Sequence, residues 1–152
     1  MMTDSLSLPI ASTQKRIAAF VIDDLIITLF FIVIFSNQIS AMFGDITEVN
    51  EAVLEHINLF IAENILIVLS IKILYHTILV WQNGMTIGKY LTKIKVISLE
   101  NHQRPSLVQA FLRAFLRIIS ETFFYLGFIM AFFTPLRQTL HDKLSQCVVI
   151  DD

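Results

Sequence analysis

The stretch that decides the fold is IAAFVIDDLIITLFFIVIF, residues Ile17–Phe35. Its 19 residues match the ~20 that a helix needs to cross the ~30 Å hydrocarbon core of a bilayer. Asp23 and Asp24 interrupt the apolar run. Two adjacent carboxylates and the lack of a small-x-small cleavage site argue against a cleaved signal peptide. The run therefore predicts a membrane-spanning helix over about residues 16–36.

Two further apolar runs follow along the chain. Ile57–Trp81 is 25 residues long and predicts a second spanning helix, with Tyr75 and Trp81 as candidate interface aromatics. Ile118–Phe133 has only 16 residues, which is short for a full crossing. It predicts either a tilted helix or a re-entrant segment, over about residues 118–134.

The segment before the third run is amphipathic. Leu107–Ile119 reads LVQAFLRAFLRII, with apolar residues at helical spacing and with Arg113 and Arg117 on one face. It predicts an interfacial helix over about residues 106–118. The sequence as a whole predicts an all-α membrane protein with about three apolar helices and one amphipathic helix, formed by an N-terminal tail (1–13) and one membrane domain (14–150).

The composition agrees with a membrane protein. Hydrophobic residues make up 55% of the 152 residues and charged residues 16%, and the mean hydropathy is +0.70. These values exclude disordered and collagen-like chains, and they argue against a soluble enzyme, whose surface needs more polar side chains. The net charge of −2 predicts no nucleic-acid partner, and the single cysteine, Cys147, excludes a disulfide within the chain.

The distribution of charge predicts the orientation. The first loop, Ser36–His56, has no Lys or Arg, whereas the segment Gln82–Arg117 has six. The positive-inside rule then places the N-terminus and the central loop (82–105) in the cytoplasm. A third full span would send the tail outside, although it carries Arg137 and Lys143. We favour a cytoplasmic tail, which a re-entrant third segment would allow.

Two short segments have the pattern of β-strands. Thr92–Leu99 alternates polar and apolar residues and is rich in β-branched side chains, and Glu100–Gln103 resembles a turn. Cys147–Ile150 is a second strand-like run. The two segments are expected to pair as a small cytoplasmic ladder.

Ionisable residues at membrane depth are costly and are therefore candidate functional residues. Asp23 follows Arg16 by seven positions, about two helical turns, so both share one face, and Asp24 lies about 100° away. Asp23 needs a partner, and it can serve either as a carboxylate that binds a proton or cation or as half of a static ion pair. The candidate partners for Asp23 are Lys72, Arg113 and Arg117.

Other charged residues have simple structural interpretations. Lys72 and His76 lie four apart on one face of the second span, which suits a proton relay or an interhelical hydrogen bond. Glu121 follows Arg117 by four, as in an ordinary helical ion pair. The four histidines are scattered, so no metal site is expected.

The segment Gly84–Lys89 only superficially resembles a phosphate-binding loop. It is one residue shorter than G-x-x-x-x-G-K, and Tyr90 stands where Ser or Thr must bind magnesium. Nucleotide hydrolysis is therefore rejected, and no other enzymatic motif or cofactor-binding loop is present in the sequence.

Four segments in order resemble the RDD family of small bacterial membrane proteins. They are RIAAFVID (Arg16–Asp23), GMTIGKYLTKIKV (Gly84–Val96), the run with Arg113 and Arg117, and LRQTLHDKLSQCVV (Leu136–Val149). The resemblance covers about Gln14 to Ile150. It implies a multispanning inner-membrane protein with a transport-related role, which includes cation/proton exchange for some members.

The family is named for one arginine and two aspartates. The resemblance assigns the arginine to Arg16 and the first aspartate to Asp23. The second is best matched by Asp142 in the His141-Asp142 pair, with Asp24 as a competitor. The chain departs from the family where Ser145-Gln146-Cys147 replaces a small residue and Thr after the His-Asp pair.

The His-Asp pair also has a physical interpretation. It lies just past Pro135 and Arg137, at the predicted cytoplasmic face. Asp142 is expected to cap a turn or to pair with Lys89 or Arg117. The Gly84–Lys89 turn and the tail would then pack together.

Two functional hypotheses follow, and neither is enzymatic. In the first, the protein is transport-related, and Asp23, assisted by Arg16 and Lys72, binds a proton or monovalent cation. In the second, it is a non-transporting scaffold or assembly factor, whose buried charges are structural and whose basic loop recruits partners or anionic lipid. Either is expected to work in the lipid bilayer as a homo-oligomer or with another membrane protein, because three helices enclose little polar volume.

Overall fold

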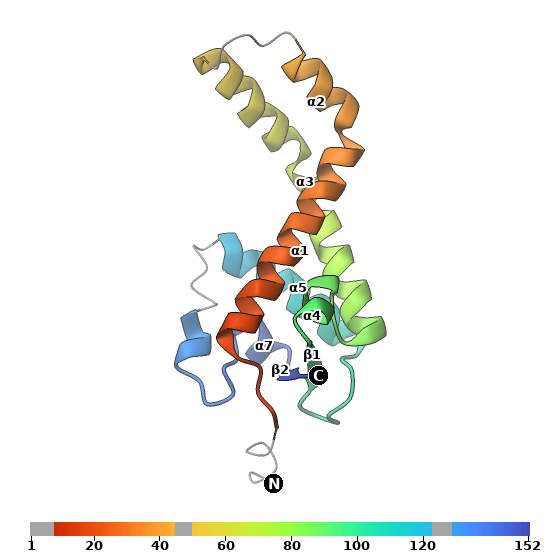
Figure 1. The fold of residues 1–152 in the computed structure, drawn as a ribbon, viewed down its shortest axis with the longest axis vertical. Helices are drawn as coiled ribbons and strands as arrows, with labels where there is room; N and C mark the ends of the chain where they lie inside the picture. The colour runs from red at the N-terminus through yellow and green to blue at the C-terminus, as the bar shows by residue number, and fades with distance from the viewer. Residues whose placement is uncertain (1–7, 45–49, 123–128) are drawn as a thin grey trace.

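A computed structural model of the chain describes residues 8–44, 50–122 and 129–152. Two long helices, α1 and α3, meet near their middles. Helices α4, α5 and α7 and strands β1 and β2 gather around the end where α1 begins and α3 ends, whereas the short helix α2 lies at the opposite end (Figure 1). The elements are α1 (Thr13–Ile34), α2 (Ser36–Phe43), α3 (Glu51–Asn83), α4 (Ile87–Leu91), β1 (Ile94–Ser98), α5 (Leu107–Thr122), η2 (Met130–Phe132), α7 (Leu140–Leu144) and β2 (Cys147–Asp151).

The ends of α1 and α3 have local causes. The side chains of Ser12 and Asn50 cap the two N-termini by accepting hydrogen bonds from backbone N–H groups in the first turn. Gly84 ends α3 in the left-handed region, at φ +72°, where a residue with a Cβ is disfavoured. The predicted helices 16–36 and 57–81 are thus present, and α3 is longer than expected at both ends.

Both long helices are long and apolar enough to cross a membrane. Their most apolar 18-residue windows have mean hydropathies of 2.6 in α1 and 2.0 in α3. Only 17% of the first window and none of the second is buried within the protein. An apolar core helix of a soluble protein would be largely buried, so this exposure favours a bilayer as the surroundings.

Helix α5 is amphipathic, as predicted, and its charged face is turned inward. Arg113 and Arg117 are each only 6% exposed, whereas Val108 is 74% and Phe111 50% exposed. A helix at an aqueous surface would show the opposite arrangement. This inverted arrangement indicates apolar surroundings for the outer face of α5.

The two predicted strands pair, as expected. β1 and β2 are antiparallel, with Val96 opposite Val149. Residues of one face of the sheet, such as Ile94 and Val96, pack with Ala19 and Val80 of the long helices. The opposite face packs with the segment around Ile10, which forms an isolated bridge to Ile150. The N-terminal segment, the central loop and the tail therefore meet at one end of the molecule.

The third apolar run does not begin a separate helix at Ile118. Helix α5 continues through that residue to Thr122, because the apolar and small residues of the two predicted segments form one uninterrupted helical stretch. Residues 123–128 of the predicted third helix lie outside the described residues, and Met130–Phe132 near its expected end form the short η2 helix.

Candidate functional site

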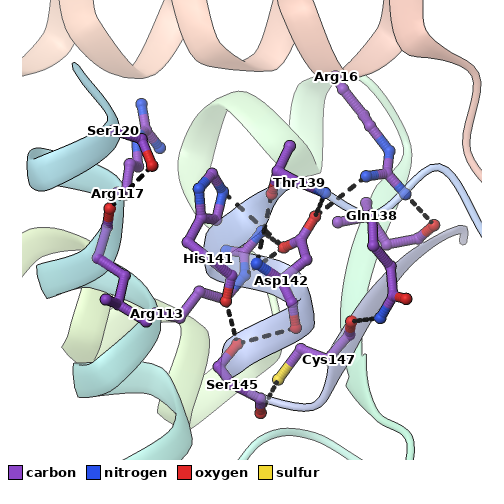
Figure 2. Close-up of polar contacts among 12 residues, drawn as sticks. Arg16, Arg113, Arg117, Ser120, Gln138, Thr139, His141, Asp142, Ser145 and Cys147 are labelled. Atoms are coloured by element: carbon purple, nitrogen blue, oxygen red, sulfur yellow. Dashed lines mark hydrogen bonds and ion pairs between the residues drawn. The ribbon is translucent and has the colours of Figure 1, made fainter. Parts of the chain in front are cut away.

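Asp142 lies at the centre of a buried ion-pair cluster (Figure 2). Its Oδ1 accepts from Arg113, 2.8 Å from Nε and 2.6 Å from Nη2. Its Oδ2 lies 3.1 Å from Nη1 of Arg16. Asp142 also forms a capping box with Thr139 at the start of α7. One carboxylate therefore joins α1, α5 and α7.

Arg16 extends this cluster to the backbone. Its Nη1 donates to the carbonyl of Arg137 at 2.6 Å, and its Nη2 donates to the carbonyl of Val149 at 3.0 Å. The planar guanidinium thus binds the turn before α7 and the strand β2 at the same time. The start of α1 is thereby fixed to the tail of the chain.

The electrostatics of the cluster favour an ionised Asp142. Burial alone would raise the pKa of this carboxyl, but Arg113, His141 and Arg16 together hold it well below its usual range. Burial lowers the pKa of His141 from 6.5 to about 3; the Asp142 carboxylate opposes this shift and Arg113 adds to it. The histidine is therefore neutral at physiological pH.

The depressed pKa of His141 predicts acid sensitivity. Below pH 6.5 the unfolded chain takes up a proton that folded His141 accepts only near pH 3, so stability falls as the pH falls. Between about pH 7 and about pH 5, the free energy of unfolding should fall by about 1–2 kcal/mol less in His141→Gln than in the wild type. Unfolding in detergent at the two pH values measures this difference. The exposed His56→Gln is the matched control. If both variants were equally sensitive to acid, the lowered pKa of His141 would not be the cause of the acid sensitivity.

Asp23 forms a second buried site and is fully inaccessible. Its Oδ1 accepts from the Tyr75 hydroxyl and from the Gly88 backbone N–H, both at 2.8 Å. Its Oδ2 accepts from the Thr86 hydroxyl at 2.6 Å, and the Lys89 ammonium lies 3.8 Å away. Three hydrogen bonds and one longer ion pair therefore compensate the burial of this carboxylate.

The backbone before α4 is shaped to meet Asp23. Thr86 is the N-cap of α4 and accepts from the Lys89 N–H. Gly88 packs directly on α1, where an added Cβ would lie 2.3 Å from the carbonyl oxygen of Ala19. Only glycine allows this approach, so the backbone N–H of residue 88 can reach the carboxylate.

A third set of charges links α1, α3 and α5. Lys72 lies 2.8 Å from Oδ1 of Asp24 and 3.0 Å from Oε2 of Glu121. Arg117 binds the other oxygen of Glu121 at 2.9 Å, as the i,i+4 spacing predicted, and its Nη1 lies 3.4 Å from Nδ1 of His76. The three helices are therefore connected through paired charges.

The three predicted partners of Asp23 are wrong. Lys72 pairs with Asp24 because that residue lies about 100° around α1 from Asp23. Arg113 is bound to Asp142, and Arg117 is bound to Glu121. Asp23 instead accepts a hydrogen bond from the Tyr75 hydroxyl.

The expectations for Asp142 are met in part. It caps a turn, as predicted, but its ion-pair partners are Arg16 and Arg113 rather than Lys89 or Arg117. The Gly84–Lys89 turn contacts α1 through Gly88, and Lys89 and Asp142 line one cavity, which brings the turn and the tail close together. Lys72 and His76 each contact other residues, on α1 and α5, and the structure gives no hydrogen bond between them.

The residues around Asp23 that the sequence interpretation missed are Tyr75, Thr86 and Gly88. The T-x-G-K order after a helix-ending glycine was the available signal, because it places a capping residue and a small residue two positions apart. Within the described residues, no group of three or more His, Cys, Asp and Glu could hold a metal ion.

Comparison with known proteins identifies the family of the chain. The RDD family model matches residues 10–146. The Uncharacterized protein YxaI of Bacillus subtilis (strain 168) is 32% identical over 101 residues. That match covers 66% of this chain and 66% of the relative, or just under two thirds of each. No solved structure shows a significant match. Because the family match covers most of the chain, including both buried aspartate sites, this protein belongs to the RDD family.

Proposed function

We propose that this protein is a non-transporting scaffold of the bacterial cytoplasmic membrane. In this proposal its buried charges join two spanning helices to a unit made of the central loop and the tail. The observation that supports it most is that each buried or half-buried carboxylate of the described helices already has close partners: Asp23, Asp24, Glu121 and Asp142.

The proposed topology has two full crossings, α1 and α3. The pairing of β1 with β2, and of Ile10 with Ile150, supports an arrangement with the N-terminus, central loop and tail on one side. That end carries the exposed basic residues Lys93 and Lys143. The positive-inside rule makes it the cytoplasmic side. The apolar outer faces of α1 and α3 would contact lipid, a second copy or another membrane protein.

The geometry of Asp23 favours a structural role over a carrier role. A carboxylate that binds a transported ion must exchange its ligands for that ion during each cycle. Asp23 is inaccessible, and its hydrogen bonds come from Tyr75, Thr86 and the Gly88 backbone. Displacing these donors would also detach α4 from α1. Neither Arg16 nor Lys72 binds Asp23, so these residues have other structural tasks.

A second candidate function, proton or cation transport, is supported by Lys89. Burial lowers the pKa of this ammonium from 10.5 to about 7, and Arg113 adds to the shift while Asp23 opposes it. Lys89 also lines a cavity between α1 and α5. A group that titrates near neutral pH beside a carboxylate is suited to exchange protons. In such a mechanism Lys89, rather than Lys72 or Arg16, would assist Asp23.

Flux measurements in proteoliposomes distinguish the two functions. We expect folded wild-type protein to give no more Na⁺, K⁺ or H⁺ flux than empty vesicles under imposed gradients. Flux that disappears in folded Asp23→Asn, and persists in Asp151→Asn, would overturn the scaffold proposal in favour of transport. Asp151 is the matched control because it pairs with Lys15 at the protein surface.

A further inference from the structure

A cavity of about 230 Å³ lies among α1, α5 and the tail. Its volume far exceeds the ~10–15 Å³ that one buried water needs, so it is not a minor packing gap. Its charged and titratable lining consists of Arg16, Lys89, Arg113, Arg117, His141 and Asp142. The cavity therefore has four basic residues and one carboxylate in its wall.

The basic residues of this wall are not all compensated. Asp142 is already shared between Arg16 and Arg113. Among the described residues, the contacts nearest to the Lys89 Nζ are the Thr86 hydroxyl at 3.4 Å and Asp23 Oδ2 at 3.8 Å. Both are long for a buried ammonium with three donors.

Burial of such donors is costly unless an anion meets them. The lowered pKa of Lys89 reflects the same deficit, because burial and the neighbouring arginine both disfavour its charged form. An anion in the cavity would accept from Lys89 and would offset the repulsion among the four basic residues. Phosphate suits this task, since its oxygens bind lysine and arginine together.

The rest of the cavity wall is apolar and reaches the outer surface. Phe20 of α1 lines the cavity, and the guanidinium carbon of Arg117 lies 4.7 Å from the centre of the Phe20 ring. Ile17 and Phe132 also line it, and they are 55% and 68% exposed. These exposed residues lie where α1 would enter the bilayer. A ligand with a phosphate and an attached apolar chain would match both parts of the wall.

We propose that this cavity binds a phosphate group, with Lys89 as its donor and the arginines of the wall as counter-charge, and that an anionic phospholipid supplies it. The headgroup would lie against the basic residues and the acyl chain would leave past Ile17 and Phe132. Free phosphate has the same anionic chemistry but cannot use the apolar wall.

Calorimetric titration of the purified protein in detergent tests this proposal. The three probes are short-chain phosphatidylglycerol, short-chain phosphatidylcholine and inorganic phosphate. We expect phosphatidylglycerol to bind, and Lys89→Gln to weaken binding at least about tenfold, because one charge-assisted contact is lost. The control variant is Lys143→Gln, which changes an exposed residue of the neighbouring helix α7 and should bind like the wild type.

Each outcome has a defined meaning. Binding of phosphatidylglycerol without binding of inorganic phosphate supports the lipid as the source. Equal binding of both, lost in Lys89→Gln, supports the phosphate site with a soluble source. Equal binding of phosphatidylcholine, or undiminished binding by Lys89→Gln, overturns the proposal. If Lys89→Gln does not fold, Lys89→Met removes the charge and retains the apolar stem.

Discussion

Asp142→Asn is expected to destabilise the folded protein by about 3–5 kcal/mol, the usual cost of removing one member of a buried ion pair. The substitution keeps the size of the side chain and much of its capping geometry. It leaves Arg16 and Arg113 facing each other without the carboxylate between them. Because these residues come from α1 and α5, the loss should separate the tail from both helices.

Unfolding in detergent, followed by circular dichroism, measures this effect. Asp151→Asn is the control, because Asp151 also forms an ion pair, 2.6 Å from Lys15, but at a position where both side chains are more than 40% exposed. Such surface pairs contribute about 0–1 kcal/mol, so this variant should unfold almost like the wild type. If the two variants lost similar stability, Asp142 would not be the centre of the buried cluster.

The elements of the fold follow from periodicity and length, which is why they could be predicted. The apolar runs at 17–35 and 57–81 have the length of spanning helices, and both are helical in the structure except for Phe35, the C-cap of α1. The alternation in Thr92–Leu99 similarly indicated β1, and its pairing with β2 required only a tail on the same side. Helix α5 was also predicted, but a periodic pattern gives no end point, so its continuation past Ile118 was missed.

The partners of the buried charges could not be predicted in the same way. Spacing along α1 places Asp23 and Arg16 on one face, but it does not reveal which helix packs there. The carboxylate at 23 faces the α3–α4 connection, and its neighbour Asp24 faces Lys72. Such a choice depends on the rotation of each helix, and a rotation of about 100° exchanges one aspartate for the next. A tyrosine hydroxyl or a backbone N–H also gives no charge pattern by which it could be found.

Gly88→Ala is the second change with a large expected effect. The added Cβ would lie 2.3 Å from the backbone oxygen of Ala19 and 2.8 Å from Oδ1 of Asp23. A backbone oxygen inside a helix cannot rotate away, so α4 must move off α1. That movement lengthens the hydrogen bond from the residue 88 N–H to Asp23, now 2.8 Å. Overpacking together with an under-satisfied buried carboxylate should cost about 3 kcal/mol or more.

The matched control for this variant is Leu91→Ala, in the same short helix. Leu91 is 60% exposed, so its truncation removes little packing within the protein and should leave the unfolding transition nearly unchanged. Combining Gly88→Ala with Asp23→Asn gives the sharper test. Both changes act on the same contact, so the double variant should lose clearly less than the sum of the single losses. Additive losses would mean that Gly88 is needed for packing on α1 alone and that its N–H does not stabilise the carboxylate.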